Sequence, residues 1–474
     1  MSLQNSSSQV STDPNGDSNL AIRFNKDYNI IGLDIYSSVV SPVDLMPMMI
    51  ELSYFEDIFK HFISGELLIT DSQGLIEKLQ LHGNEYIRIA FAKDGNTKIK
   101  IDKLFRVYKI SHRQKSKNGE TETYIIHFCS DEAVISEQYR VSKSYKGKTV
   151  ASIINDLLTN HLKVPAIKLK NTFIEDTKNI FNFVVPNLKP FEAIHWLTSF
   201  GKSAAQKSVG NDMIFFENAK GYNFCSFQTL FQTQPYFTYR YNPKNTSITQ
   251  NGDDPTAKVF NVLSYEIIDN FDSLQNVSNG TYANRVIGID PLIRQYYNTD
   301  FNYAKYYGKA SSLNKNPVVN NLQNRFGDAL YETPTGQTKL TVSNKNQNTV
   351  PYVSQRTGSV PFNFNYDDII SQRKSQLSLS NYTRLKISIA GDPNVTVGQT
   401  INFDLLSGSP GSQNQEKQLD AFYSGKYVVT AVRHMIQTGG YTTIMEITKD
   451  SVPNSYSTVD NTNPAIKALT TGNI

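Results

Sequence analysis

The seven histidines are the side chains best suited to catalysis or metal binding, because imidazole is the commonest metal ligand and a frequent general base. None of them forms a His-Glu-x-x-His motif or another metal-ligand spacing. We expect His161 and His195 to lie on helices beside apolar faces, and His112 and His434 to lie next to turns at strand ends. The sequence therefore predicts no metal centre. The remaining histidines are His61, His82 and His127.

Nucleophile and phosphate motifs are missing from the sequence as well. It has no Gly-x-Ser-x-Gly elbow, no Gly-rich loop before a Lys-Ser/Thr pair and no Gly-x-Gly-x-x-Gly after a strand. Adjacent acids occur at Glu56-Asp57, Asp253-Asp254 and Asp367-Asp368, and such pairs are typical of solvated loops or helix starts. A glycosidase needs two carboxylates facing each other across a cleft, which a sequence does not reveal. The sequence therefore favours a structural or interaction protein with no catalytic residues and no cofactor.

Cys129 and Cys225 are the only cysteines. Two thiols so far apart make neither a disulfide framework nor a zinc site. We expect both to be buried small apolar residues of a protein that works in a reducing compartment.

Composition bounds the class of protein. A chain of 474 residues is long enough for two to four domains, and its formal net charge of +4 argues against a concentrated basic stripe for nucleic acid. The 27 Tyr and 26 Phe against one Trp, with only 19% charged residues, are typical of β-rich proteins with broad half-polar surfaces. The N-terminus has no secretory signal pattern, and the longest apolar run is too short to span a membrane.

The elements that would position any site are mostly strands. We predict a mainly β chain with an α+β part: two tube-like antiparallel β-barrel domains, a small α+β domain and an insertion. Helices are expected at 148–162, from 190 to near 201, and at 368–379. The predicted division is a disordered tail at 1–20, a first barrel at 21–140, the α+β domain at 141–235, a second barrel at 236–295 and 365–452, a polar insertion at 296–364, and a flexible tail at 453–474.

The two predicted barrels repeat one pattern. Gly83 precedes a strand, a second strand ends near His112, and a Gly-containing turn leads into a third. Gly398 and His434 stand in the same order in the C-terminal part, where the loop 405–424 can hold the extra residues. Any two antiparallel β domains can share such spacing, so duplication and coincidence both remain open.

Two segments are candidate contact surfaces. The stretch 43–62 is rich in Met and aromatic residues, interrupted by Glu56-Asp57, and it is typical of a partly exposed hairpin that docks on another subunit. The run 112–117 is the densest basic segment and predicts a charged hairpin tip. The candidate subunit or tube contacts are Met48, Tyr54, Phe55, Phe59, Phe62, Arg113, Lys115 and Lys117.

Four stretches together resemble the baseplate hub proteins of contractile-tailed phages, such as the central hub of T-even phages, and the N-terminal half of type VI secretion spike proteins. Their order along the chain carries the resemblance more than any single motif. They are Ser64–Ser72 with Leu81–Glu85, Lys189–Leu197, Gly280–Val286, and Gly391-Asp392-Pro393 through Val397-Gly398-Gln399 to Ser424–Tyr427.

The resemblance implies an assembly role in the virion. Hubs of this family are homotrimers whose two tube-like barrels per subunit form a ring of six. That ring joins the six-fold tail tube to the three-fold central spike, contacts other baseplate (wedge) proteins, and lets the genome pass without sequence-specific binding. It also implies assembly in the host cytoplasm and no membrane insertion. The chain departs from the T-even hub in its long 296–364 segment, and it lacks the repetitive needle of the secretion spikes.

Two other classes of function stay open. One is a tail-associated cell-wall hydrolase whose β domains carry a hidden pair of carboxylates. The other is a carbohydrate-binding tail or adhesin protein, suggested by the aromatic and Asn content.

Overall fold

The computed structural model describes ten segments of the chain. Strands dominate these segments, which confirms the predicted mainly β class with helical parts. The predicted tail at 1–20 lies outside the described segments. So do the predicted tail from residue 455 onward and much of the predicted insertion at 296–364. The described segments are 28–38, 41–93, 96–178, 180–205, 211–241, 261–290, 294–318, 338–342, 366–406 and 419–454.

The first β module spans residues 28–129. Its strands alternate between buried and exposed side chains, as in β4 (Ser64–Asp71), because one face packs on the core and the other meets solvent. The pairing order is β3-β4-β7-β6-β5-β1, with the short β2 added to β1. The other strands are β1 (Tyr28–Tyr36), β2 (Val43–Asp44), β3 (Met49–Asp57), β5 (Tyr86–Lys93), β6 (Asn96–Lys115) and β7 (Glu122–Cys129), with a 3-10 turn at Met46–Met48 and helix α1 at Leu75–Lys78.

The second β module is assembled from segments far apart in the sequence, and it has the same topology. Its pairing order is β14-β19-β22-β21-β20-β13, which matches the first module strand for strand when each is numbered along the chain. Five of the six strands also share their pairing sense, but β13 runs parallel to β20 whereas β1 runs antiparallel to β5. The strands are β13 (Thr238–Tyr241), β14 (Val262–Asn270), β19 (Thr383–Ala390), β20 (Thr400–Leu405), β21 (Gly425–Gln437) and β22 (Gly440–Lys449).

Two irregularities of the first module recur in the second, although each module also has a shift of its own, at Ser111/Gln114 and at Ile267/Asp269. The β6–β7 ladder shifts register between Val107 and Lys109, and the β21–β22 ladder shifts between Val429 and Ala431. The β3–β4 and β14–β19 ladders each skip one residue near the start of the first strand. Bulges at equivalent places are specific features of a fold, so their agreement favours duplication over coincidence.

The glycines of the repeated pattern occupy equivalent turns. Gly83 has φ +99° and Gly398 has φ +84°, a left-handed region that glycine adopts at little cost. A carbonyl oxygen just after each glycine accepts from an equivalent strand. Val107 N–H of β6 donates to Glu85 O, and Val429 N–H of β21 donates to Gln399 O.

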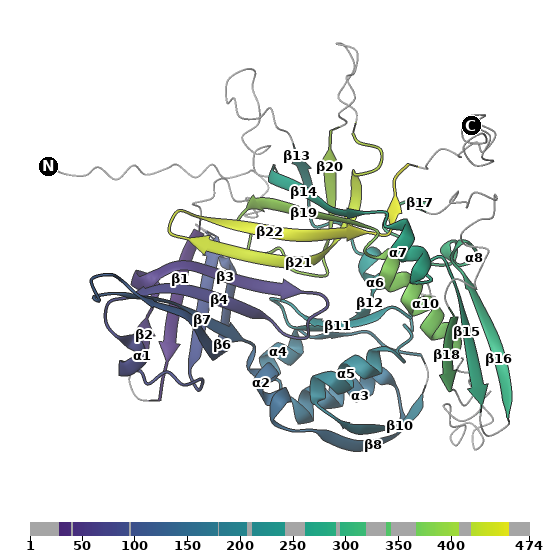
Figure 1. Cartoon of the computed structure of the whole chain (residues 1–474), viewed down its shortest axis with the longest axis horizontal. Coiled ribbons are helices and arrows are strands. Elements are labelled where there is room, and N and C mark those ends of the chain that lie inside the picture. Colours follow the sequence, from purple (N-terminus) through teal and green to yellow (C-terminus); the bar gives the residue numbers. More distant parts are fainter. Residues whose placement is uncertain are drawn as a thin grey trace, which may run out of the picture.

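The two modules join edge to edge into one sheet. The C-terminal half of β21 pairs antiparallel with β3, from Ala431 opposite Asp57 to Gln437 opposite Glu51. Within the described residues this pairing unites both modules in a 13-stranded sheet. Figure 1 shows β21 at this junction, with β22 on its side away from β3. The hydrophobic cores also interlock, since Ile436 and Tyr441 pack in the core of the first module and Ile58 in that of the second.

An α+β segment, 131–231, packs below the junction. Helix α3 (Val150–Asp156) begins after Thr149, whose side chain accepts from Ser152 N–H at 3.2 Å, and helix α5 (Pro190–Thr198) begins at the predicted proline. Both starts confirm the sequence analysis. The other elements are α2 (Asp131–Gln138), β8 (Val141–Lys148), a π-helical turn (Leu157–His161), α4 (Ala166–Lys170), β9 (Phe173–Ile174), β10 (Phe181–Leu188), β11 (Met213–Glu217), β12 (Tyr222–Ser226) and α6 (Phe227–Phe231).

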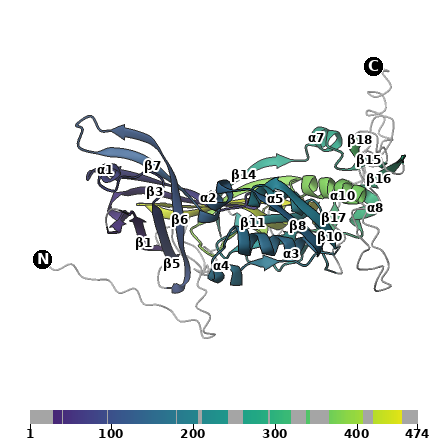
Figure 2. The same cartoon turned by 90° about the horizontal axis from the view of Figure 1, so that it is seen from below.

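A third group of elements lies at the end of the molecule opposite the first β module (Figures 1 and 2). Helix α10 (Tyr366–Leu379), predicted at 368–379, docks through Arg373, whose guanidinium donates to the carbonyl oxygens of Asn211 and Met213. Strands β15 and β16 pair as a hairpin, so the predicted boundary between the second barrel and the insertion, at residue 295, falls within one paired unit. The remaining elements are α7 (Ser273–Ser278), β15 (Ala283–Asp290), β16 (Gln295–Asn302), α8 (Tyr303–Tyr307), β17 (Asn316–Pro317), β18 (Thr338–Val342) and β23 (Ser451–Val452).

Candidate assembly interfaces

The β3–β21 seam is the contact that holds the two β modules in line. Tyr54 lies opposite His434 in the register, with their ring centroids 5.7 Å apart, and both side chains are fully buried. His434 Nδ1 lies 2.8 Å from the Tyr441 hydroxyl. Burial lowers the pKa of His434 to about 3, so the ring is neutral at pH 7. The expectation that His434 is merely next to a turn is wrong, because β21 continues beyond it and β3 covers it.

Glu56 lies at the corner where the seam meets the rest of the chain. Its carboxylate accepts from Val397 N–H at 3.0 Å and from the Tyr54 hydroxyl at 3.1 Å. Burial raises its pKa to about 7, although these donors and Lys103 oppose the shift. The acidic pair was expected to be solvated. For Glu56 this is wrong, because the side chain is 1% exposed and accepts from Val397, which lies 341 residues away in the turn before β20.

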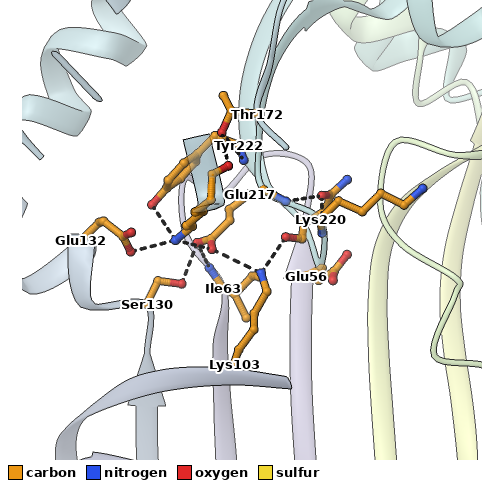
Figure 3. A network of polar contacts seen from close by, with 12 residues as sticks. Glu56, Ile63, Lys103, Ser130, Glu132, Thr172, Glu217, Lys220 and Tyr222 are labelled. Atoms are coloured by element: carbon orange, nitrogen blue, oxygen red, sulfur yellow. Dashed lines mark hydrogen bonds and ion pairs between the residues drawn. The ribbon is translucent and has the colours of Figure 1, made fainter. Parts of the chain in front are cut away.

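A buried ionic cluster joins the first β module to the α+β segment (Figure 3). Glu217 at the end of β11 accepts from Ser130 Oγ at 2.6 Å and Ile63 N–H at 3.1 Å, both from the first module. Its second oxygen lies 2.7 Å from Lys168 Nζ and 3.7 Å from Lys103 Nζ. Burial alone would raise the pKa of Glu217, but the two ammonium groups outweigh it and hold the pKa below its usual range.

The cluster is neutralised by a second carboxylate. Lys168 also pairs with Glu132 at 2.8 Å and lies over the Tyr222 ring at 4.5 Å. Lys103 donates to the carbonyl oxygen of Asn218 at 2.9 Å. Two buried cations and two buried carboxylates thus balance. The cluster therefore links the α+β segment to the first β module through paired charges.

An apolar groove of about 1150 Å³ opens between the first module and α5. Phe59 and Phe62 line it with His61, His195 and Trp196. Phe59 is 49% exposed, and burial lowers the pKa values of both histidines. The structure thus brings two of the candidate aromatic residues to one surface beside α5.

The other candidate contacts fall at two places. Tyr54 and Phe55 belong to β3, where Phe55 lies under the Arg433 guanidinium at 5.5 Å, and Met48 is buried just before this strand. Arg113, Lys115 and Lys117 belong to the β6–β7 hairpin, where Arg113 and Lys115 both pair with Glu122. Lys117 lies exposed at the tip. The predicted contact role of all these residues stays a prediction.

Among the described residues, no three His, Cys, Asp or Glu side chains gather where they could hold a metal ion. No helix in the described segments is long and apolar enough to cross a membrane.

Comparison with known proteins gives one full-length relative. The chain is 20% identical over 440 residues to the probable baseplate hub protein gp334 of Vibrio phage KVP40, covering 90% of this chain and 94% of the relative. The chain is similar to phage baseplate hub proteins. This finding confirms the resemblance drawn from the sequence. No family model matches the chain.

One solved structure of a phage tail protein has a similar fold. The 43 kDa tail protein of prophage MuSo2 from Shewanella oneidensis shares 7% identity, covers 89% of this chain and 99% of its own, and superposes with a TM-score of 0.52. A component of the type VI secretion system from E. coli shares 9% identity over 91% of this chain and 77% of its own, with a TM-score of 0.40.

Sequence reasoning missed the seam and the ionic cluster. The Met and aromatic content of 43–62 marked β3 as a contact surface, but nothing in the sequence indicated that its partner is β21 of the same chain. Lys103, Lys168 and Glu217 stand in three unrelated contexts along the sequence, and no spacing rule connects them.

Proposed function

We propose that this chain is a structural baseplate hub of a contractile phage tail. Three copies form a ring that joins the six-fold tail tube to the three-fold central spike. The observation that carries the proposal is the duplicated six-strand topology within one chain, with two register shifts at equivalent places in both copies. A homotrimer with two equivalent modules per chain presents six similar modules around one axis, which is the symmetry match that such a junction needs.

The full-length similarity to a probable phage baseplate hub protein supports the same assignment. Within this proposal the chain is not an enzyme, and its partners are further copies of itself, the tail tube or its initiator, the spike and other baseplate proteins. It resides in the tail baseplate of the virion after assembly in the host cytoplasm. Phe59 and Phe62 at the groove, Phe55 on β3 and the basic hairpin tip are the proposed meeting points with these neighbours, whereas Met48 and Tyr54 are buried within the chain.

The experiment is a measurement of native mass. Purified full-length protein, alone and co-expressed with the spike protein of the same phage, is measured by light scattering over a range of concentrations. A trimer in either sample supports the proposal, and a monomer in both contradicts it. Peptidoglycan cleavage by the purified chain would instead favour the hydrolase alternative, and glycan binding by the monomer would favour the adhesin alternative.

A further inference from the structure

Strands β14 and β6 of the large sheet each have an edge without a ladder partner within the described residues. Strand β14 pairs with β19 on one side, and only Asn261, just before it, bridges to another strand, β13. Strand β6 pairs with β5 up to Arg106, and beyond Tyr108 it pairs with β7 alone. An unpaired edge is a template for pairing with another chain unless the protein protects it.

These two edges are the counterparts of the two strands that form the internal seam. In the shared strand order, β14 occupies the place of β3, and β6 occupies the place of β21. Each module therefore has one edge of each kind. Inside the chain, the β3 edge of the first module meets the β21 edge of the second. The β14 edge of the second module and the β6 edge of the first have no such partner within the described part of the chain.

We propose that β14 of one copy pairs antiparallel with the 109–115 part of β6 in the next copy, so that the contact between copies repeats the β3–β21 seam. The inference rests on the proposed function, whose ring it describes strand by strand. Since each copy offers one edge of each kind, the contact is head-to-tail and closes a ring when three copies bring six modules together.

Strand β14 carries exposed apolar side chains, whereas its counterpart β3 is covered by β21. The ladders place Ile267 of β14 at the position of Tyr54 in β3. Tyr54 is fully buried because β21 covers it, whereas Ile267 is 40% exposed. Leu263 and Ile268 on the same strand and Tyr108 on β6 are also exposed. A strand of the next copy would cover this apolar surface.

The equivalence also predicts the register. Ser53 lies opposite Met435 in the internal seam, and Glu266 is the counterpart of Ser53. The β6–β7 ladder has one further shift between Ser111 and Gln114, which makes Gln114 the counterpart of Met435. Glu266 should therefore lie beside Gln114.

Charges on the two edges are complementary in this register. Glu266 and Asp269 are exposed on β14, where they also pair with Lys386 and Arg384 of β19. Arg113 and Lys115 flank Gln114 on the β6 edge and share the carboxylate of Glu122. Opposite charges across a strand pair favour one register over its neighbours.

Disulfide trapping in the full-length protein tests the register. The variant carrying both Glu266→Cys and Gln114→Cys is oxidised mildly and run on a non-reducing denaturing gel. We expect covalent dimers and trimers that reductant abolishes and nothing larger than a trimer. Variants that combine Glu266→Cys with Arg113→Cys or Lys115→Cys scan one residue to either side and should cross-link less. The native thiols at Cys129 and Cys225 are buried and do not compete.

Matched controls define the outcomes. Each single variant should stay monomeric on the gel, and so should Gln114→Cys with Ile167→Cys, which places the second thiol on α4, where Ile167 is 76% exposed. A native trimer that none of the three pairings cross-links overturns this inference and leaves the proposed function standing. Cross-linking of a single variant to itself, or a ladder that extends beyond the trimer, also overturns it. A chain that is monomeric even with its spike overturns both.

A second variant tests the edge without cysteines. Ile267→Lys places a charge on the proposed contact and should raise the dissociation constant of the trimer at least about tenfold. Ile167→Lys, an equally drastic change at an exposed apolar residue elsewhere, should leave it unchanged. Circular dichroism of both variants should match the parent protein. Equal dissociation constants for Ile267→Lys and the parent would overturn the inference.

Discussion

Glu56 accepts a hydrogen bond from the backbone N–H of Val397 at 3.0 Å, although 341 residues separate the two along the chain. Glu56 is the penultimate residue of β3 in the first module, and Val397 lies just before β20 in the second. The bond therefore closes the corner at which the two modules meet.

Stability should depend on pH through Glu56. Burial raises its pKa from 4.5 to about 7, so the folded chain prefers the protonated form. This contribution to the free energy of unfolding is complete below pH 4.5 and is lost as the pH rises to 7. The Glu56→Gln variant lacks this loss, so its stability relative to the parent should rise by up to about 3 kcal/mol over that interval.

Urea unfolding at a series of pH values measures the Glu56 effect. Glu77→Gln, at an exposed position on α1, is the control and should run parallel to the parent protein. A constant difference between Glu56→Gln and the parent from pH 4.5 to 7 would show that Glu56 is not held protonated.

The ionic cluster should respond in the opposite sense. The Glu217→Gln variant leaves Lys103 without its carboxylate partner and Lys168 with Glu132 alone, and loss of one partner from a buried charge pair costs about 3–5 kcal/mol. Because the pKa of Glu217 lies below its usual range, its stabilisation is present above pH 4.5 and is lost as the pH falls. The deficit of the variant should therefore be largest near pH 7 and shrink in acid.

The control for the cluster is Asp300→Asn, which breaks the Arg285–Asp300 pair on the exposed β15–β16 hairpin. Exposed ion pairs contribute little, so its unfolding curve should match that of the parent. Similar losses for both variants would contradict a special role of the buried cluster.

Close packing beneath the seam should make Gly65 intolerant of a side chain. A Cβ at Gly65 would lie 2.2 Å from Phe128 Cζ and 2.5 Å from the carbonyl oxygen of Ser53. Gly65→Ala should therefore lower the free energy of unfolding by about 1–3 kcal/mol, as overpacking of a core does. Gly439→Ala, at a turn with nothing within 4 Å, is the matched control. Thermal unfolding compares the two, and an unchanged midpoint for Gly65→Ala would show that the strands can separate at no cost.

Both native thiols should be unreactive in the folded chain. Burial raises the pKa of Cys129 to about 12 and that of Cys225 well above its ordinary value, so little thiolate is present at pH 8. A chromogenic disulfide reagent should react rapidly with both only after unfolding in denaturant. The Gln114→Cys variant provides one fast exposed thiol for comparison, and fast reaction of the parent would contradict the described burial.

Local patterns predicted the strands and helices because each leaves a period or a cap in the sequence. The apolar/polar alternation of β19 and the start of α5 at residue 190 are examples. The Gly83/His112 and Gly398/His434 pattern left duplication and coincidence open, and the matching strand order favours duplication. Edge-to-edge pairing leaves no such period, so the β3–β21 seam stayed hidden. The burial of Glu56 was also beyond prediction, because its donor Val397 lies 341 residues away.

The central claim is that three copies of this chain form a ring of six similar β modules between tube and spike. A cryo-electron microscopy reconstruction of the intact tail tip measures this directly through the copy number and placement of the chain. The account predicts three copies around the tail axis, with each first module following the second module of its neighbour. Six copies, a single copy, or three copies whose β modules do not alternate around the lumen would contradict it.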